Sequence, residues 1–443
     1  MSWAKVSERR WERPVTGMEG YFVYTGSMSA AHCDGRHQYT IFSKLRVDLD
    51  INPADIESAL KRAWKQLRSE QPQIATVVDG TTMVYEVPDE AALQNWLAST
   101  FVISSAADAE ELCRNVEPIK QVTLYYIPKS SELVLRAQHY TIDGTGTLLL
   151  WDRYLTALTT PVEVTFGDEH TRLAPSIEEV LKVSEPTPEE TEKATALLMG
   201  YATKAPGVGP VSKVGTVPAG RSQNVEMTFP TRTTEAIIKI CKEKGISVTS
   251  AVHAAYIQAI IKHANPNGTL SHYANLGLFN LRPYLPKPYN TNEYAASVYY
   301  TPLPLNMDLP SQFWETARTL DNYYGTSVKN DPEILPLHAH MTRVLCQAIQ
   351  MPEYQGGPIP GDAQVSSLGI VERYIQHTYG STAKVLDVKL GVEIVLGMTM
   401  FFIYTFRDQL RLVYSFNDGY EEPAHISMYL EEVQKVLTEE LLA

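Results

Sequence analysis

The most informative stretch of the chain runs Leu133-Val-Leu-Arg-Ala-Gln-His139-Tyr-Thr-Ile-Asp143-Gly144. Its opening residues are apolar and branched, which predicts a buried strand, and residues 148–158 predict a helix. His139 therefore falls where a strand ends and a helix begins. We expect this junction to hold the histidine side chain at the rim of a cleft with little freedom.

An imidazole at such a junction has a pKa near neutrality, so it can accept a proton from a hydroxyl or an amine as a general base. Asp143 could orient the ring or lock the turn, and Gly144 leaves room for close backbone packing. The spacing alone leaves a second interpretation open, in which the histidine and the aspartate are purely structural.

The rest of the chain predicts two similar α/β lobes. Residues 204–221 are dense in proline and glycine and lack a helical period, so they predict a linker. It separates an N-terminal lobe, residues 1–203, from a C-terminal lobe, residues 222–443. Each part mixes paired strands with helices, which favours mixed sheets flanked by helices and a ligand between the lobes.

Composition excludes several classes of function. The 443 residues carry a formal net charge of −13, which argues against binding to nucleic acid or anionic lipid. The longest apolar stretch, residues 394–406, is too short to span a bilayer and predicts a buried strand. Without an apolar leader, we expect a cytoplasmic protein. Widely spaced cysteines argue against disulfides and thiolate zinc sites; they are Cys33, Cys113, Cys241 and Cys346.

The segment from His139 to Gly144 resembles the HxxxDG motif of the CoA-dependent acyltransferase superfamily. That superfamily includes the plant BAHD acyltransferases, chloramphenicol acetyltransferase, the condensation domains of peptide synthetases and the fungal trichothecene O-acetyltransferases. The plant DFGWG segment is kept only as Asp387 and Gly391, so the fungal branch fits better. Four further segments resemble landmarks of the superfamily in the expected order: Trp11-Glu-Arg-Pro14 with Glu19, Gly245 to Ala255, Phe279-Asn-Leu-Arg-Pro283, and Ser366-Ser-Leu-Gly369.

The resemblance implies a fold and a reaction. The fold would be two pseudo-equivalent chloramphenicol acetyltransferase-like lobes with the active-site tunnel between them. The reaction would move an acyl group, expected to be acetyl, from CoA to a hydroxyl of a secondary metabolite. Acyl-CoA would be a co-substrate, with no tightly bound cofactor and no metal. The partners would be acyl-CoA and a small hydroxylated acceptor, without nucleic acid or membrane, and the protein would be a monomer.

The resemblance also implies roles for individual residues. His139 would be the general base. Asp143 would point away from the substrate and pair with Arg282, a structural role at a turn that Gly144 shares. Ser366 or Ser367 would stabilise the oxyanion of the tetrahedral intermediate. Without the resemblance, Arg282 would be interpreted as an ordinary solvated charge and the two serines as strand-end hydroxyls.

Two other functions remain open. The same scaffold could take its acyl group from a carrier-protein thioester or catalyse a cyclisation, as condensation-domain relatives imply. It could also serve as a non-catalytic binding protein that retains the cleft. Histidine pairs with spacings that a metal could use lack an acid or cysteine companion, so we do not expect zinc. The pairs are His32 with His37 and His338 with His340.

Overall fold

The computed structural model describes residues 2–115, 117–205, 207–210, 219–265, 267–309, 312–329, 334–352 and 363–442. Its contacts define two compact units, each discontinuous in sequence. Unit 1 is Met1–Ser184, Asn280–Tyr300 and Val371–Glu393; unit 2 is Glu185–Phe279, Thr301–Ile370 and Ile394–Ala443. Two segments of the predicted C-terminal lobe therefore belong to unit 1. Within the predicted linker, residues 206 and 211–218 lie outside the described residues.

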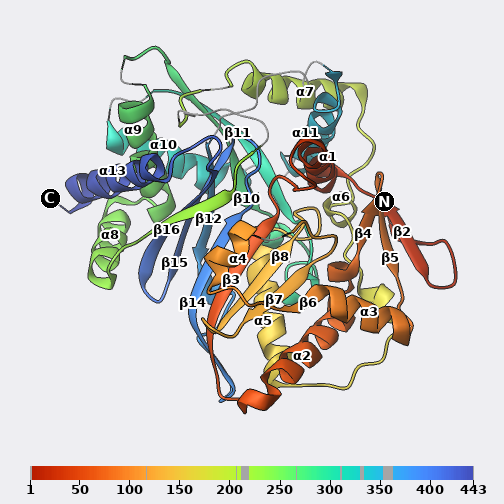
Figure 1. Ribbon diagram of the computed structural model, residues 1–443. Coiled ribbons are helices and arrows are strands. Elements are labelled where there is room, and N and C mark those ends of the chain that lie inside the picture. The colour runs from red at the N-terminus through yellow and green to blue at the C-terminus, as the bar shows by residue number, and fades with distance from the viewer. Residues whose placement is uncertain are drawn as a thin grey trace. The chain divides into compact units, whose positions relative to one another are not determined.

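Unit 1 is built on a mixed six-stranded sheet of order β13-β14-β3-β8-β7-β6, in which only the β6–β7 pairing is parallel. A smaller sheet has the order β1-β2-β5-β4. Helix α5 packs against β14 and against α2 (Figure 1). The α2 side chains Leu60, Ala63, Trp64 and Leu67 are at most 1% exposed, so the helix buries one apolar face.

The strands of unit 1 are β1 (Ala4–Lys5), β2 (Arg10–Pro14), β3 (Ile41–Leu49), β4 (Val77–Asp79), β5 (Thr82–Glu86), β6 (Phe101–Ile103), β7 (Thr123–Ile127), β8 (Glu132–Ala137), β13 (Thr378–Tyr379) and β14 (Ala383–Val392). Its helices are α1 (Gly17–His32), α2 (Ile56–Glu70), α3 (Glu90–Thr100), α4 (Ala109–Asn115), α5 (Gly144–Thr159) and α6 (Ile177–Val180). Its short 3-10 turns are Pro53–Asp55, Pro72–Ala75, Glu169–Arg172, Arg282–Tyr284, Asn292–Tyr294 and Val371–Arg373.

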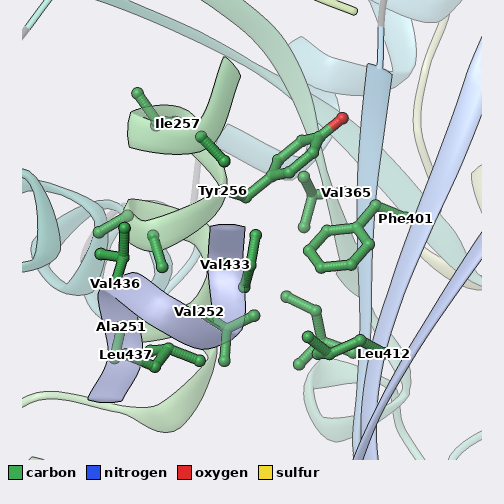
Figure 2. Packing of buried hydrophobic residues seen from close by; sticks show 14 of the residues in the cluster. Ala251, Val252, Tyr256, Ile257, Val365, Phe401, Leu412, Val433, Val436 and Leu437 are labelled. Carbon is green, nitrogen blue, oxygen red and sulfur yellow. The ribbon is translucent and has the colours of Figure 1, made fainter. Parts of the chain in front are cut away.

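Unit 2 packs helices onto the sheet β12-β15-β16-β9, in which β12 runs parallel to β15. Figure 2 shows Tyr256 of α9 and Phe401 of β15 facing each other, with ring centroids 4.6 Å apart. Val433 of α13 and Leu412 of β16 belong to the same hydrophobic cluster and are both fully buried. This layer of helices on a mixed sheet confirms the expected α/β class.

The strands of unit 2 are β9 (Ser222–Thr228), β12 (Ala363–Ile370), β15 (Thr399–Phe406) and β16 (Gln409–Asn417). A separate pair of strands, β10 (His272–Asn280) and β11 (Tyr300–Asp308), has its terminal residues Asn280 and Tyr300 in unit 1. The helices are α7 (Pro188–Ala202), α8 (Thr231–Lys244), α9 (Val248–Ala264), α10 (Phe313–Thr326), α11 (Ile334–Ala348) and α13 (Pro423–Leu441).

The strand predicted at residues 394–406 is wrong in its first part, because β15 begins only at Thr399. The backbone of Ile394 bonds to side chains instead of to a neighbouring strand: its N–H donates to Ser222 Oγ and its carbonyl accepts from Asn417 Nδ2, both at 2.8 Å. Apolar composition indicates that a segment is buried, but it does not determine the partners of its backbone hydrogen bonds. Within the described residues, no helix combines the length and the apolar character needed to cross a bilayer.

Candidate active site

Strand β8 carries the chain into the turn that holds His139. Its last residue, Ala137, pairs with Ile41 of the neighbouring strand β3. The next side chain is also fixed, because Gln138 donates to the Ile119 carbonyl at 3.0 Å. Helix α5 begins at Gly144, so the predicted strand-to-helix junction is confirmed. The histidine thus stands on a turn that the sheet and the helix both anchor.

Aromatic side chains surround the His139 ring. Phe22 of α1 stacks on it, with ring centroids 3.9 Å apart and an interplanar angle of 13°. Tyr300 lies at 5.9 Å in a tilted arrangement. Nδ1 is buried and has no hydrogen-bond partner elsewhere in the described part of the chain, although the residue as a whole keeps some exposed surface. Phe22 therefore fixes the plane of the ring and excludes water from one face.

The near-neutral pKa expected for His139 from the sequence is wrong, because burial lowers it to about 4. The opposing effects of its own backbone and of the Asp143 charge are smaller. The ring is therefore neutral at physiological pH. A neutral imidazole keeps one ring nitrogen as a proton acceptor. The arrangement can remove a proton from a group that reaches the accessible part of the ring.

Removing the stacked ring should raise the pKa of His139. We expect Phe22→Ala to move it from about 4 toward the ordinary value of about 6.5, because water would then hydrate the protonated ring. NMR titration of the labelled histidine measures this shift without any assay of activity. Tyr24→Ala is the matched control, since Tyr24 lies on the same helix outside the stack. An unchanged pKa in Phe22→Ala would show that the stack does not set it.

Asp143 does not face the histidine; its carboxylate is 3% exposed and fully engaged in holding the turn. Arg282 Nη1 donates to both carboxylate oxygens at 2.8 Å. Oδ1 also accepts from the Gly146 N–H, which caps α5, and Oδ2 accepts from the Tyr299 N–H, both at 2.7 Å. The structure thus brings together two of the residues that the superfamily resemblance singled out, Asp143 and Arg282.

Three neighbours of this ion pair were missed by sequence reasoning. Arg282 Nη2 donates to Ser297 Oγ at 2.9 Å, and the Arg282 guanidinium lies 5.4 Å from the Tyr299 ring centroid. Gly146 leaves no room for a side chain, because a Cβ there would stand 2.4 Å from the Ala295 carbonyl oxygen. A glycine two residues after Gly144 was a visible signal for Gly146, but nothing local marked Ser297 or Tyr299.

A second buried ion pair fixes the start of the helix that carries Phe22. Arg13 and Glu19 form two parallel hydrogen bonds, Nη1 to Oε2 at 2.6 Å and Nη2 to Oε1 at 2.7 Å. Burial raises the pKa of the Glu19 carboxyl, and the Arg13 charge opposes this shift. Between them, Gly17 opens α1 with φ of +48°, a conformation that favours glycine. The opening segment therefore anchors the residue that stacks on His139.

The two candidate serines lie in unit 2, on strand β12. Ser367 Oγ forms a 2.7 Å hydrogen bond with Thr249 Oγ1 of α9. Val365, two residues earlier on the same face of the strand, packs in the core beneath α9. Ser366 lies on the opposite face of the sheet. Because successive side chains of a strand point to opposite faces, the two serines differ in position. Ser367 lies at the interface between the sheet and α9, and Ser366 does not.

His253 of α9 has structural surroundings. His253 is fully buried in unit 2, with Nδ1 2.9 Å from the Tyr324 hydroxyl and Nε2 2.8 Å from the Tyr273 hydroxyl. Burial lowers its pKa to about 3. No group of three or more histidine, cysteine or acidic side chains is arranged to hold a metal ion within the ranges that the structure describes.

Comparison with known proteins gives the following matches. No family model matches the sequence. Acetyltransferase pigO of Monascus ruber is 28% identical over 456 residues, covering 100% of this chain and 98% of that protein. O-acetyltransferase pigM of the same organism is 29% identical over 399 residues, covering 87% and 77%. The solved structure of TRI3 trichothecene 15-O-acetyltransferase from Fusarium sporotrichioides matches with a TM-score of 0.80 at 17% identity, covering 99% and 97%. The superfamily resemblance is confirmed.

The TRI3 match shows that the chain shares its fold nearly from end to end. Both Monascus relatives carry acetyltransferase names. The tunnel that the resemblance implies and the roles of the individual site residues stay predictions.

Proposed function

We propose that this chain is an acyltransferase that moves an acetyl group from acetyl-CoA to a hydroxyl group of a secondary metabolite. The observation that carries the proposal is His139, held neutral by burial and fixed in orientation by Phe22 on a turn braced by the Asp143–Arg282 pair. The acetyltransferase names of the Monascus relatives support acyl transfer as the reaction class.

The proposed step balances without a covalent enzyme intermediate. The imidazole takes the proton of the acceptor hydroxyl as that oxygen attacks the thioester carbonyl carbon. The tetrahedral intermediate collapses when the C–S bond breaks, and the departing thiolate receives the proton from the imidazolium. Asp143 acts only through the turn, because Arg282 and two backbone N–H groups occupy its carboxylate. The oxyanion role of Ser366 or Ser367 stays a prediction from the resemblance.

The test is a donor and acceptor screen. The purified chain is incubated with acetyl-, malonyl- or longer acyl-CoA and a mixed extract of hydroxylated metabolites. We expect release of free CoA thiol and, by mass spectrometry, one acceptor that gains an acetyl group. An acyl group delivered by a carrier-protein thioester but not by CoA would refute the proposed donor. Ligand binding with no thioester consumed from any donor would refute catalysis and favour a binding protein.

A further inference from the structure

One buried arginine of unit 1 lacks the partner that the others have. Five arginine side chains are buried among the described residues. Four of them have a carboxylate oxygen within 4.0 Å; the pairs are Arg13–Glu19, Arg136–Glu393, Arg282–Asp143 and Arg411–Glu226. The fifth, Arg68 of α2, is 4% exposed and forms no such pair within the described part of the chain. Its charge is therefore without a directly bonded counter-charge.

The nearby acidic residue Glu169 does not supply the missing ion pair. Glu169 interacts with Arg68 over a longer distance, and the Tyr85 hydroxyl interacts with both. That hydroxyl donates to Glu169 Oε1 at 2.8 Å, and the other oxygen of Glu169 accepts from the Gly167 N–H at 2.6 Å. Nε and Nη1 of Arg68 are buried with no acceptor among the described residues. A buried charge without an ion-pair partner is costly, so an external anion beside Arg68 would be favourable here.

Arg68 lines an open cavity of about 930 Å³ in unit 1. Residues of α3 and of the strands β4 and β5 line the cavity; Figure 1 labels these three elements. The Arg68 guanidinium carbon lies 4.6 Å from the centroid of the Trp96 ring, which lines the same cavity. Trp96 Nε1 is likewise buried without an acceptor in the described ranges. Arg68 and Trp96 therefore both line this cavity, while the donor atoms Nε and Nη1 of Arg68 and Nε1 of Trp96 are themselves buried.

The remaining walls limit the charge and the shape of a ligand. Apolar side chains line much of the cavity: Val77, Val78, Val84, Val87, Pro88 and Ala92. At its edge, Arg9 pairs with Asp89 and Arg10 pairs with Glu86, so these charges are already neutralised. Asp79 adds a further negative charge. Repulsion by the Asp79 carboxylate favours a singly charged ligand over a phosphate dianion.

We propose that this cavity binds a small carboxylic acid anion with an apolar body. The carboxylate supplies the counter-charge for Arg68, and the apolar body covers the valine-rich wall. This site is separate from the turn of His139 and does not depend on the proposed acyl transfer.

The test measures binding of octanoate to the full chain by isothermal titration calorimetry and by thermal shift. We expect octanoate to bind and to raise the unfolding temperature. Arg68→Met should weaken binding by about tenfold or more, because a charged hydrogen-bonding partner is lost. Arg62→Met is the matched control, since Arg62 is an exposed arginine on the same helix.

Three comparisons make the outcome decisive. Octan-1-ol binding as tightly as octanoate would overturn the carboxylate assignment, because the cavity would then recognise only the apolar chain. Inorganic phosphate binding more tightly than octanoate would overturn the monoanion assignment. No octanoate binding at millimolar concentration, or equal binding by Arg68→Met, would overturn the site. The free Arg68→Met protein should fold, since the substitution removes an unpaired buried charge, and its unfolding temperature checks this.

Discussion

Replacing His139 with alanine is expected to lower kcat for acetyl transfer by about 10²–10⁴-fold, the usual contribution of a positioned general base. The reason lies in the proton of the acceptor. Without the imidazole, the hydroxyl must attack the thioester while it still holds its proton. The measurement is the steady-state rate with acetyl-CoA and the acceptor found by the screen. The Asp143–Arg282 pair does not touch the histidine side chain, so the turn should keep its structure in the variant.

Two companion variants separate loss of the base from loss of the fold. His139→Gln keeps a polar side chain of similar length but no basic nitrogen, so it should be about as slow as the alanine variant. His32→Ala removes an exposed histidine at the end of α1 and should keep the wild-type rate. Circular dichroism and thermal unfolding check that all three proteins are folded. Turnover by His139→Ala at the wild-type rate would contradict the general-base role.

The pH dependence of the rate follows from the pKa of about 4. The neutral ring is the active form, so the rate should be independent of the ionisation of His139 at neutral pH and fall only as the pH approaches 4. If Phe22→Ala raises this pKa as proposed, the fall should begin at a higher pH in that variant. If kcat of the wild-type protein instead fell near pH 6.5, the His139 ring would be hydrated in the enzyme–substrate complex, which would contradict this prediction.

The junction around His139 could be predicted because its signals are local. A branched apolar run ends at Ala137 and a helical run follows, and Asp143 occupies the capping position of that helix. Neighbouring residues determine such features, so their structure follows from a short stretch of sequence. Arg13 and Glu19, which form an ion pair, are also close in sequence. Both belong to the opening segment that resembles a landmark of the superfamily.

Contacts between distant segments could not be predicted in the same way. Arg282 lies 139 residues after Asp143, and only the superfamily resemblance connected them. Phe22 had no signal at all, because its role depends on how α1 packs onto the turn after β8. Strand β14 pairs with β3 along Ile41–Leu49 although more than three hundred residues separate them, so a division at residues 204–221 could not reveal that unit 1 includes it. Such pairings depend on the tertiary structure rather than on local propensity.

The Asp143–Arg282 pair is expected to contribute more to stability than any exposed ion pair of unit 1. Asp143→Ala should lower the free energy of unfolding by about 3–5 kcal/mol, because it leaves a buried guanidinium without its counter-charge. The substitution also removes the acceptor for the N–H groups of Gly146 and Tyr299. Calorimetry or urea unfolding measures the loss. Asp168→Ala is the matched control, since Asp168 bonds Arg172 at 3.0 Å on the surface and should leave stability unchanged within error.

A double variant distinguishes the pair from its parts. Arg282→Met alone leaves the Asp143 carboxylate buried with its two backbone donors but without the guanidinium, so it should also destabilise the protein. In Asp143→Ala with Arg282→Met, neither buried charge is left uncompensated. The loss in the double variant should therefore be smaller than the sum of the two single losses, as coupled neighbours require. Strict additivity would mean that the two side chains act independently, contrary to the 2.8 Å hydrogen bonds between them.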